Sequence, residues 1–261
     1  MKIEDRHLAI ASWVAQHGTI SVEEVIEQFG VSPATARRDL DALGQQMIVI
    51  RTRGGARAAA ISGDLPLRYR AALMGSEKLQ IARAAAAMVQ PGQTVAFSGG
   101  TTTTQIAQEL GVRASADPEF GEKLTTVVTN AINIANDLIV RPELRVVLTG
   151  GAAIARSYEL VGPLAKAALP LINVDVFFLG VNAINPARGF FTEFESEAEI
   201  SAAILEKAVQ SYVVADHTKF ANTAFALICE PTDVTGVITD GDADADAVAR
   251  LRDAGCPVVL V

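Results

Sequence analysis

Cysteine is scarce in this sequence: only Cys229 and Cys256 occur among 261 residues. So low a count argues against a disulfide framework and fits a reducing compartment. Neither cysteine has a histidine beside it in the sequence, so we interpret both as small buried hydrophobic residues and not as reactive thiols.

Long apolar runs are also missing. No stretch reaches the ~18–20 uninterrupted apolar residues that a membrane-spanning helix needs. The segment Met1–Arg6 carries acidic residues and has no apolar run behind it, so the sequence shows no secretory signal. We therefore expect a cytoplasmic protein with no membrane partner.

Basic residues are outnumbered: the chain has 22 Lys and Arg against 30 Asp and Glu, a net charge of −8. The distribution of charge matters more than its sum. Residues 1–60 are neutral, and within them residues 34–57 hold five arginines and two aspartates, a local charge of +3. A basic patch on an otherwise acidic protein is compatible with one edge that contacts DNA phosphates.

Residues 1–58 show the pattern of three short helices followed by a hairpin. Ser21 can cap the second helix, and Glu24 three residues later completes a capping box. After the third helix, Met47–Ile50 is predicted to form a strand and Gly54-Gly55 a turn into a second strand. This order of elements is typical of a winged helix-turn-helix domain.

The third helix has the clearest start signal, since Ser32 is a capping residue and Pro33 suits the first helical position. Its predicted buried stripe is Ala36, Leu40 and Leu43. The opposite face carries Ala34, Arg37, Arg38 and Asp41.

Two adjacent exposed arginines on a helix that follows a tight turn indicate a helix that enters the major groove of DNA. There an arginine can pair with guanine O6 and N7, at ~1–3 kcal/mol of discrimination. Arginines of the hairpin can reach phosphates or the minor groove. The alternative is a pair of helices with a solvated basic face that binds no DNA. The helix caps and the β-hairpin that follows the third helix disfavour this alternative. The residues predicted to contact DNA are Ser21, Ser32, Pro33, Ala34, Thr35, Arg37, Arg38, Asp41, Arg51, Arg53 and Arg57.

Residues 59–75 are predicted to form a linker, because they contain Gly63 and Pro66 and show little periodicity. In residues 76–261, short apolar runs alternate with helical stretches. This alternation predicts a mostly parallel, Rossmann-like α/β domain whose sheet is covered by helices on both faces. The predicted strands are 95–97, 126–128, 145–148, 174–179, 212–215, 234–239 and 258–261.

The run Ser98–Thr104 follows the first of these strands and precedes a helix. Its glycines let the backbone approach an anion, while N–H groups at the helix start and threonine hydroxyls can donate hydrogen bonds. The run has neither the Gly-Lys-Ser/Thr nor the Gly-x-Gly-x-x-Gly pattern, which disfavours a nucleotide or dinucleotide. We expect a phosphate-binding loop, no cofactor and no metal; the alternative is an ordinary β–α turn.

Four further predicted strands end in polar residues. Because ligands of open α/β sheets bind beyond the carboxyl ends of the strands, these ends are expected to converge on one crevice. Lys219 is the natural countercharge to a phosphate, and Asn130 and Asp216 can bond hydroxyl groups. Taken singly, each residue is explained as a turn or a cap. We therefore predict a site for a small phosphorylated ligand, called the effector below. The residues predicted to bind it are Ser98, Gly99, Gly100, Thr101, Thr102, Thr103, Thr129, Asn130, Gly150, Gly151, Gly180, Asp216 and Lys219.

The run Val31–Leu40, followed by Arg53–Ala56, resembles the DeoR family of repressors. The recognition helix of that family typically carries Thr-Ile-Arg-Arg-Asp-Leu, and its wing ends in His-Gly-Gly-Ala. Here Ala36 stands in place of a bulkier apolar residue, and Arg53 replaces the wing histidine. A permanently charged arginine favours a phosphate contact by the wing.

The two arginines of the third helix are not expected to do the same work. One of Arg37 and Arg38 is expected to read a base, while the other holds a phosphate or pairs with Asp39 or Asp41. The sequence leaves open which arginine takes which role.

The resemblance covers nearly the whole chain and implies a sensor domain similar to ribose-5-phosphate isomerase, with phosphorylated sugars or related metabolites as effectors. The matching positions there are Gly100, Thr101, Thr102, Thr129, Asn130, Gly150, Gly151, Asp216, Lys219 and Phe220. Glu77-Lys78 also matches, and we interpret this pair as interface or structural. The resemblance implies a repressor of carbohydrate or polyol catabolism genes, a homodimer or homotetramer that leaves a double-stranded DNA operator when a phosphorylated sugar or polyol binds.

The second hypothesis is a sugar-phosphate isomerase that carries a DNA-binding domain. Isomerisation needs a carboxylate base beside the C2 proton of the substrate. The candidates are Asp175, Glu193, Glu195, Glu197 and Glu199. Residues 193–199 lead into a helix start, where acidic side chains favour the positive end of the dipole. We therefore predict a regulator and no catalytic residue.

Overall fold

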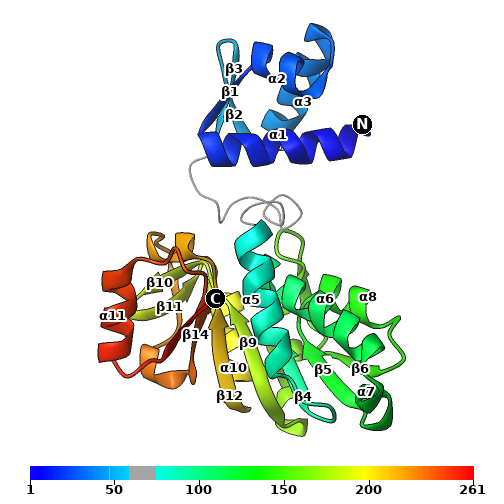
Figure 1. Cartoon of the computed structure of the whole chain (residues 1–261), viewed down its shortest axis with the longest axis vertical. Coiled ribbons are helices and arrows are strands. Elements are labelled where there is room, and N and C mark those ends of the chain that lie inside the picture. Colours follow the sequence, from blue (N-terminus) through cyan, green and yellow to red (C-terminus); the bar gives the residue numbers. More distant parts are fainter. Residues whose placement is uncertain (47, 59–74) are drawn as a thin grey trace. The chain divides into compact units, whose positions relative to one another are not determined.

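The computed structural model describes residues 1–46, 48–58 and 75–261. The chain divides into two compact units, Met1–Gly75 and Ser76–Val261, called here the N-terminal and the C-terminal unit (Figure 1). The predicted linker, apart from Gly75, lies outside the described residues, and so does Met47. None of the helices in the described ranges is long and apolar enough to cross a membrane.

The N-terminal unit packs three described helices against a small antiparallel sheet with the strand order β1-β3-β2 (Figure 1). Its elements are α1 (Ile3–His17), β1 (Thr19–Ser21), α2 (Val22–Phe29), α3 (Pro33–Gln45), β2 (Val49–Thr52) and β3 (Gly55–Ala58). The predicted stripe of Ala36, Leu40 and Leu43 is completely buried, and Ile10 and Val25 pack in the same core. The predicted winged helix-turn-helix architecture is confirmed.

The two strands of the hairpin begin at other residues than predicted. β2 begins at Val49 and does not include the predicted Ile48, because the N–H of Ile48 donates to the carbonyl O of Leu43 at 2.9 Å and is not available to the sheet. Gly55, predicted as part of the turn, is already the first residue of β3. The turn is therefore Arg53-Gly54, one residue earlier than the pattern indicates.

The C-terminal unit is built, within the described residues, on a seven-stranded sheet whose neighbouring strands are all parallel. The strand order is β15-β14-β12-β9-β4-β5-β6. The strands are β4 (Thr94–Phe97), β5 (Thr125–Thr129), β6 (Leu144–Leu148), β9 (Val174–Gly180), β12 (Ala208–Val214), β14 (Gly236–Thr239) and β15 (Val258–Leu260). Each of them overlaps a predicted strand, so the predicted parallel α/β architecture is confirmed.

Helices cover both faces of this central sheet (Figure 1). Phe97 and Phe178 pack with α5, α6 and α8 on one face, while Ala96 and Phe177 pack with α9, α10 and α11 on the other. Burial on both faces is the reason that the strands read as continuous apolar runs. The helices are α5 (Gly75–Met88), α6 (Thr101–Ala116), α7 (Pro118–Glu122), α8 (Ile132–Leu138), α9 (Pro163–Ala167), α10 (Glu195–Leu205) and α11 (Ala245–Asp253), with 3-10 turns at Leu169–Leu171, His217–Phe220 and Pro231–Asp233.

Short antiparallel strands that the sequence does not predict complete the C-terminal unit. β7 (Ala152–Ile154) pairs with β8 (Glu159–Val161), and a separate sheet has the order β10 (Ala183–Asn185), β11 (Gly189–Thr192), β13 (Ala226–Cys229). The β7–β8 hairpin returns beside the end of β5, since Leu160 N donates to the carbonyl O of Asn130 at 2.7 Å. The hairpin therefore lies at the carboxyl edge of the central sheet.

Candidate DNA-binding surface and effector site

The starts of α2 and α3 are fixed by local side chains. Ser32 Oγ accepts the N–H of Thr35 at 3.2 Å, with Pro33 at the first helical position. Ser21 Oγ accepts the N–H of Glu24 at 3.0 Å, and the Glu24 carboxylate accepts the N–H of Ser21 at 2.7 Å. Both predicted caps are confirmed, and they set where the two helices of the motif begin.

Asp39 lies on the inner side of α3 and is only 2 % exposed. Its carboxylate accepts Arg6 Nε at 2.6 Å, Arg6 Nη2 at 3.1 Å and His7 Nε2 at 3.0 Å. Burial alone would raise the pKa of Asp39, but the bonds and charges of Arg6 and His7 outweigh it and hold this pKa below its ordinary value. Asp39 thus ties α3 to α1 and is not the partner of Arg37 or Arg38.

Arg51 connects the wing to α3. Its Nε donates to Asp41 Oδ1 at 2.8 Å, and its Nη1 donates to the carbonyl O of Gly55. Asp41 therefore bonds Arg51, and the described residues show no ion pair of Arg37 or Arg38 with Asp39 or Asp41. The DNA contacts of Arg51 and Asp41 stay predictions. Both side chains already bond to each other.

Among the described residues of the N-terminal unit, four arginines remain exposed: Arg37 and Arg38 on α3, Arg53 in the hairpin turn and Arg57 on β3. Over the described residues, no carboxylate forms an ion pair with any of the four. Their positive charge is thus available to an anionic partner. The structure leaves their predicted contacts with DNA as predictions.

In the C-terminal unit, the strand order reverses between β4 and β9. From β4 it runs outward through β5 and β6, and from β9 it runs through β12, β14 and β15. Gly180 N, at the end of β9, donates to Ser98 Oγ after β4 at 2.9 Å. A Cβ on Gly180 would lie 3.0 Å from the carbonyl O of Gly99, so the glycine permits this approach. Open α/β sheets bind ligands at such a switch point.

The loop after β4 leads directly into α6. Gly100 has a φ of +138° and precedes Thr101, the first helical residue. The N–H groups of a first helical turn have no partner inside the helix and carry the positive end of its dipole. The hydroxyls of Thr103 and Thr104 donate back to the carbonyl O of Gly100. Backbone N–H groups, and not these two hydroxyls, are what the loop offers to an anion.

Glu159, on β8, reaches this loop. Its Oε1 accepts the N–H of Gly99 at 3.0 Å and Nδ2 of Asn130 at 3.2 Å, and the residue is only 6 % exposed. Asn130 Nδ2 also donates to the carbonyl O of Leu160 at 3.3 Å. A buried carboxylate of the protein itself thus bonds a backbone N–H of the predicted phosphate loop.

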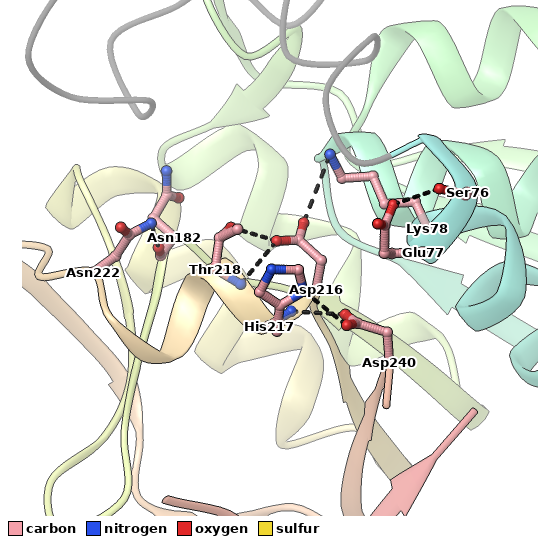
Figure 2. Close-up of polar contacts among 9 residues, drawn as sticks. All are labelled: Ser76, Glu77, Lys78, Asn182, Asp216, His217, Thr218, Asn222 and Asp240. Atoms are coloured by element: carbon pink, nitrogen blue, oxygen red, sulfur yellow. Dashed lines mark hydrogen bonds and ion pairs between the residues drawn. The ribbon is translucent and has the colours of Figure 1, made fainter. Parts of the chain in front are cut away.

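Asp216, after β12, is the second buried carboxylate of this edge (Figure 2). Lys78 Nζ, from α5, lies 3.6 Å from Asp216 Oδ2, and both side chains are almost fully buried. Asp216 Oδ1 accepts the N–H of Thr218 at 3.2 Å, and the Thr218 hydroxyl donates to the same oxygen. Burial would raise the pKa of Asp216, but the charges of Lys78 and Lys219 and the bonds from Thr218 lower it below its ordinary value.

Several predicted effector residues have internal roles instead of open side chains. Ser98, Thr103, Thr129 and Asn130 are buried and bonded within the unit, as with Thr129 Oγ1, which donates to the carbonyl O of Phe97 at 2.9 Å. Thr102 is also buried, whereas the rest of the set is half-buried apart from Asp216: Gly99, Gly100, Thr101, Gly150, Gly151, Gly180 and Lys219. All of them lie at the ends of parallel strands or in the segments that follow these ends, at one sheet edge. Their contact with an effector stays a prediction.

Glu159 is not among the residues predicted from the sequence, and the pairing of Lys78 with Asp216 was not predicted either. A signal for Lys78 exists, because it lies 3, 4 and 7 residues before the buried Ile81, Ala82 and Ala85 of α5. This spacing places it on the inner stripe of the helix. Glu159 offers no comparable signal, since its strand has three residues and its partners lie 60 and 29 residues away.

The candidate bases for isomerisation separate in the structure. Asp175 lies at the opposite end of the sheet, near the start of β9, where its Oδ2 accepts the N–H of Thr94 at 2.7 Å. Glu199 pairs with Lys166. Glu197 is buried and accepts the Thr192 hydroxyl at 2.8 Å. Of these three, Glu197 alone is a buried carboxylate with a hydroxyl partner.

His217, Asp240 and Asp242 place potential ligand atoms within 4.8 Å of one another. Asp240 Oδ1 accepts the backbone N–H of His217 at 2.7 Å, and Asp240 Oδ2 lies 2.7 Å from His217 Nδ1 (Figure 2). Asp240 Oδ2 also accepts the backbone N–H of Asp242 at 3.2 Å. These bonds explain the group as a brace between two loops. We assign no metal to it.

A winged helix-turn-helix unit with exposed arginines, followed by an α/β unit with a polar switch-point edge, is the arrangement expected of a two-domain transcription regulator. Residues 6–61 match the model of the DeoR-like helix-turn-helix domain, and residues 74–241 match that of the DeoR C terminal sensor domain. The chain therefore belongs to the DeoR family of transcription regulators.

Similar proteins cover almost its full length. The chain is 32 % identical over 254 residues to the glycerol-3-phosphate regulon repressor of Escherichia coli (strain K12), covering 97 % of both. It is 33 % identical over 256 residues to the HTH-type transcriptional regulator GlpR of Haloferax volcanii, covering 98 % of this chain and 96 % of that protein. Among solved structures, ribose 5-phosphate isomerase A of Methanocaldococcus jannaschii matches with a TM-score of 0.40 and 17 % identity, over 55 % of this chain and 53 % of that one. The names of the two full-length relatives indicate a regulator rather than an enzyme.

Proposed function

We propose that this chain represses genes of carbohydrate or polyol catabolism and leaves its DNA operator when a phosphorylated sugar or polyol binds to the C-terminal unit. The observation that carries the proposal is the charge cluster of Lys78, Asp216 and Lys219 at the carboxyl edge of the sheet. It lies on the same edge as the start of α6, where an anion is favoured.

The dimensions of this edge suit a small phosphorylated metabolite. β12 lies two strands from β4, and neighbouring strands are ~4.8 Å apart, so their ends are separated by about 10 Å. Backbone N–H groups at Gly100 and Thr101 would hold the phosphate, while Asp216 would bond hydroxyl groups. Lys219 would balance the phosphate charge. The name of the Escherichia coli relative supports a phosphorylated three-carbon polyol as the first compound to test.

Recognition of DNA is assigned to the exposed arginines of the N-terminal unit. Arg37 and Arg38 would enter the major groove on α3, and Arg53 and Arg57 would contact phosphates from the hairpin. A homodimer or homotetramer would place two such units on the half-sites of an operator.

A thermal-shift screen of the full chain tests the effector class. Glycerol 3-phosphate, ribose 5-phosphate and fructose 6-phosphate are compared with ATP, NAD and glycerol. A ligand at 100 times its Kd stabilises the folded state by ~2.7 kcal/mol, so a true effector raises Tm by several degrees. Stabilisation by ATP or NAD, with no response to any sugar phosphate, would contradict the proposal.

The isomerase hypothesis deserves one direct test, because Glu197 is a buried carboxylate that accepts a hydrogen bond from the Thr192 hydroxyl. The full chain is incubated with ribose 5-phosphate, and ketose formation is followed over time. We expect no turnover above a protein-free control. Turnover that Glu197→Gln abolishes would replace the regulator with the isomerase hypothesis.

A further inference from the structure

The Gly99 N–H is already bonded to an anion of the protein. Glu159 Oε1 accepts this N–H at 3.0 Å, in the loop between β4 and the first turn of α6. Loops of this kind bind phosphates and carboxylates through backbone N–H groups. The Glu159 carboxylate therefore takes a position that suits an external anion.

The residues around Glu159 are shaped to receive its side chain. A Cβ on Gly99 would lie 2.3 Å from Glu159 Cγ and 2.5 Å from Cδ, so glycine is required for this contact. Tyr158, the residue before Glu159, has a φ of +60°, a left-handed conformation that costs free energy for a non-glycine residue. The neighbouring backbone holds this geometry, since Ile132 N donates to the carbonyl O of Tyr158 at 2.9 Å.

The polar groups next to Glu159 are not all satisfied. Asn130 donates to Glu159 Oε1, but its own Oδ1 is buried without a hydrogen-bond partner, and so is Ser157 Oγ of the same β7–β8 hairpin. Buried polar atoms of this kind are normally paired with protein, water or ligand. The unpaired atoms of Asn130 and Ser157 indicate a region that can provide hydrogen-bond partners to a bound ligand.

We propose that Glu159 occupies part of the anion site in the effector-free C-terminal unit, and that it has to withdraw before the phosphate of the effector binds. This inference rests on the proposed function. Two anions at hydrogen-bond distance from one N–H repel each other strongly in a buried site. Glu159 therefore weakens the affinity for the effector, and withdrawal of its carboxylate displaces the β7–β8 hairpin that carries it.

Isothermal titration of the full chain with inorganic phosphate and with glycerol 3-phosphate tests this competition. Glu159→Gln keeps an oxygen acceptor for Gly99 N and Asn130 Nδ2 but removes the charge. We expect the variant to bind both phosphates at least about tenfold more tightly than the wild type, because the like charge is gone. Glycerol, which carries no charge, serves as the matched ligand whose binding the substitution does not strengthen. Unchanged or weaker phosphate binding by Glu159→Gln would overturn the proposal.

A double-mutant cycle tests the contact itself. Gly99→Ala destabilises the wild type, because the new Cβ meets the Glu159 side chain, and we expect much of this loss to disappear in the Glu159→Ala background. Additive effects would refute the packing on which the inference depends.

The outcomes separate this inference from the proposed function. If glycerol 3-phosphate binds wild type and Glu159→Gln equally well, only the role of Glu159 is refuted. If neither protein binds inorganic phosphate or a sugar phosphate, the effector site and the role of Glu159 are both refuted.

Discussion

Asp39 in the N-terminal unit and Asp216 in the C-terminal unit are both buried carboxylates with a pKa below the ordinary value, but they are held differently. Asp39 accepts three short bonds from Arg6 and His7, between 2.6 and 3.1 Å. Asp216 accepts the N–H and the hydroxyl of Thr218, but its charged partners are Lys78, at 3.6 Å, and the half-buried Lys219.

This difference fits the roles that we propose for the two units. A closed set of charge-assisted hydrogen bonds is strong and fixes geometry, which suits a helix that has to meet DNA in one orientation. A looser pair beside a half-exposed lysine can change partners when an anion arrives. The buried charge of the N-terminal unit holds α3, whereas that of the C-terminal unit lies where we propose that the effector binds.

The largest expected effect comes from opening the Asp39 cluster. Asp39→Ala leaves Arg6 and His7 without their acceptor, and removing one partner of a buried ion pair costs ~3–5 kcal/mol. Trp13 of α1 is the only tryptophan in the chain, so its fluorescence during denaturation with urea reports the N-terminal unit. The control is Asp41→Ala, which breaks an exposed pair and costs at most about 1 kcal/mol. Equal losses for the two variants would contradict the assignment.

The next effect concerns the outward arginines. Arg37→Ala removes a predicted base contact and is expected to lower specific DNA affinity by 1–3 kcal/mol, roughly 5- to 150-fold, and to relax sequence preference. Arg53→Ala, the matched control on the wing, is expected to reduce the slope of log K against log salt by about 0.9 with little change in preference. Both are measured on duplexes that the protein selects from a random-sequence library. If Arg53→Ala alone lost sequence preference, Arg53 would be the residue that reads a base and Arg37 would not.

The smallest effect is a pH dependence of the C-terminal unit. A carboxyl group whose pKa is lower in the folded state stabilises that state above its unfolded pKa of ~3.9, and loses this contribution as pH falls through the lower folded value. Acid therefore weakens the pairing of Asp216 with Lys78. Asp216→Asn is expected to flatten the decline of stability below about pH 4, measured by circular dichroism, without moving the Trp13 transition. A decline as steep as that of the wild type would show that Asp216 contributes little.

The sequence predicts features that depend on neighbouring residues. The Ser21 and Ser32 caps and the apolar runs of the central sheet need only local patterns, and the structure confirms them. β1, β7 and β8 have three residues each, too few for a periodic signal. β1 pairs with β3 across Gly55, where a Cβ would lie 2.2 Å from the carbonyl O of Ile20.

The partners of the buried polar side chains could not be predicted from the sequence. Asp39 finds its partners 32 and 33 residues away, and Asp216 finds Lys78 across more than half of the C-terminal unit. Such contacts are set by the packing of α1 on α3 and of α5 on one face of the central sheet. The sequence predicted the residue types and the edge on which they lie, but not which charges pair.

The most direct test of the account is the release of DNA by an effector. Fluorescence anisotropy follows a labelled, selected duplex bound to the wild type or to Lys219→Ala while glycerol 3-phosphate or another stabilising sugar phosphate is added. The account predicts equal starting affinity for DNA, release from the wild type, and retention by Lys219→Ala at the same concentrations. Release from both proteins at the same concentration would contradict it.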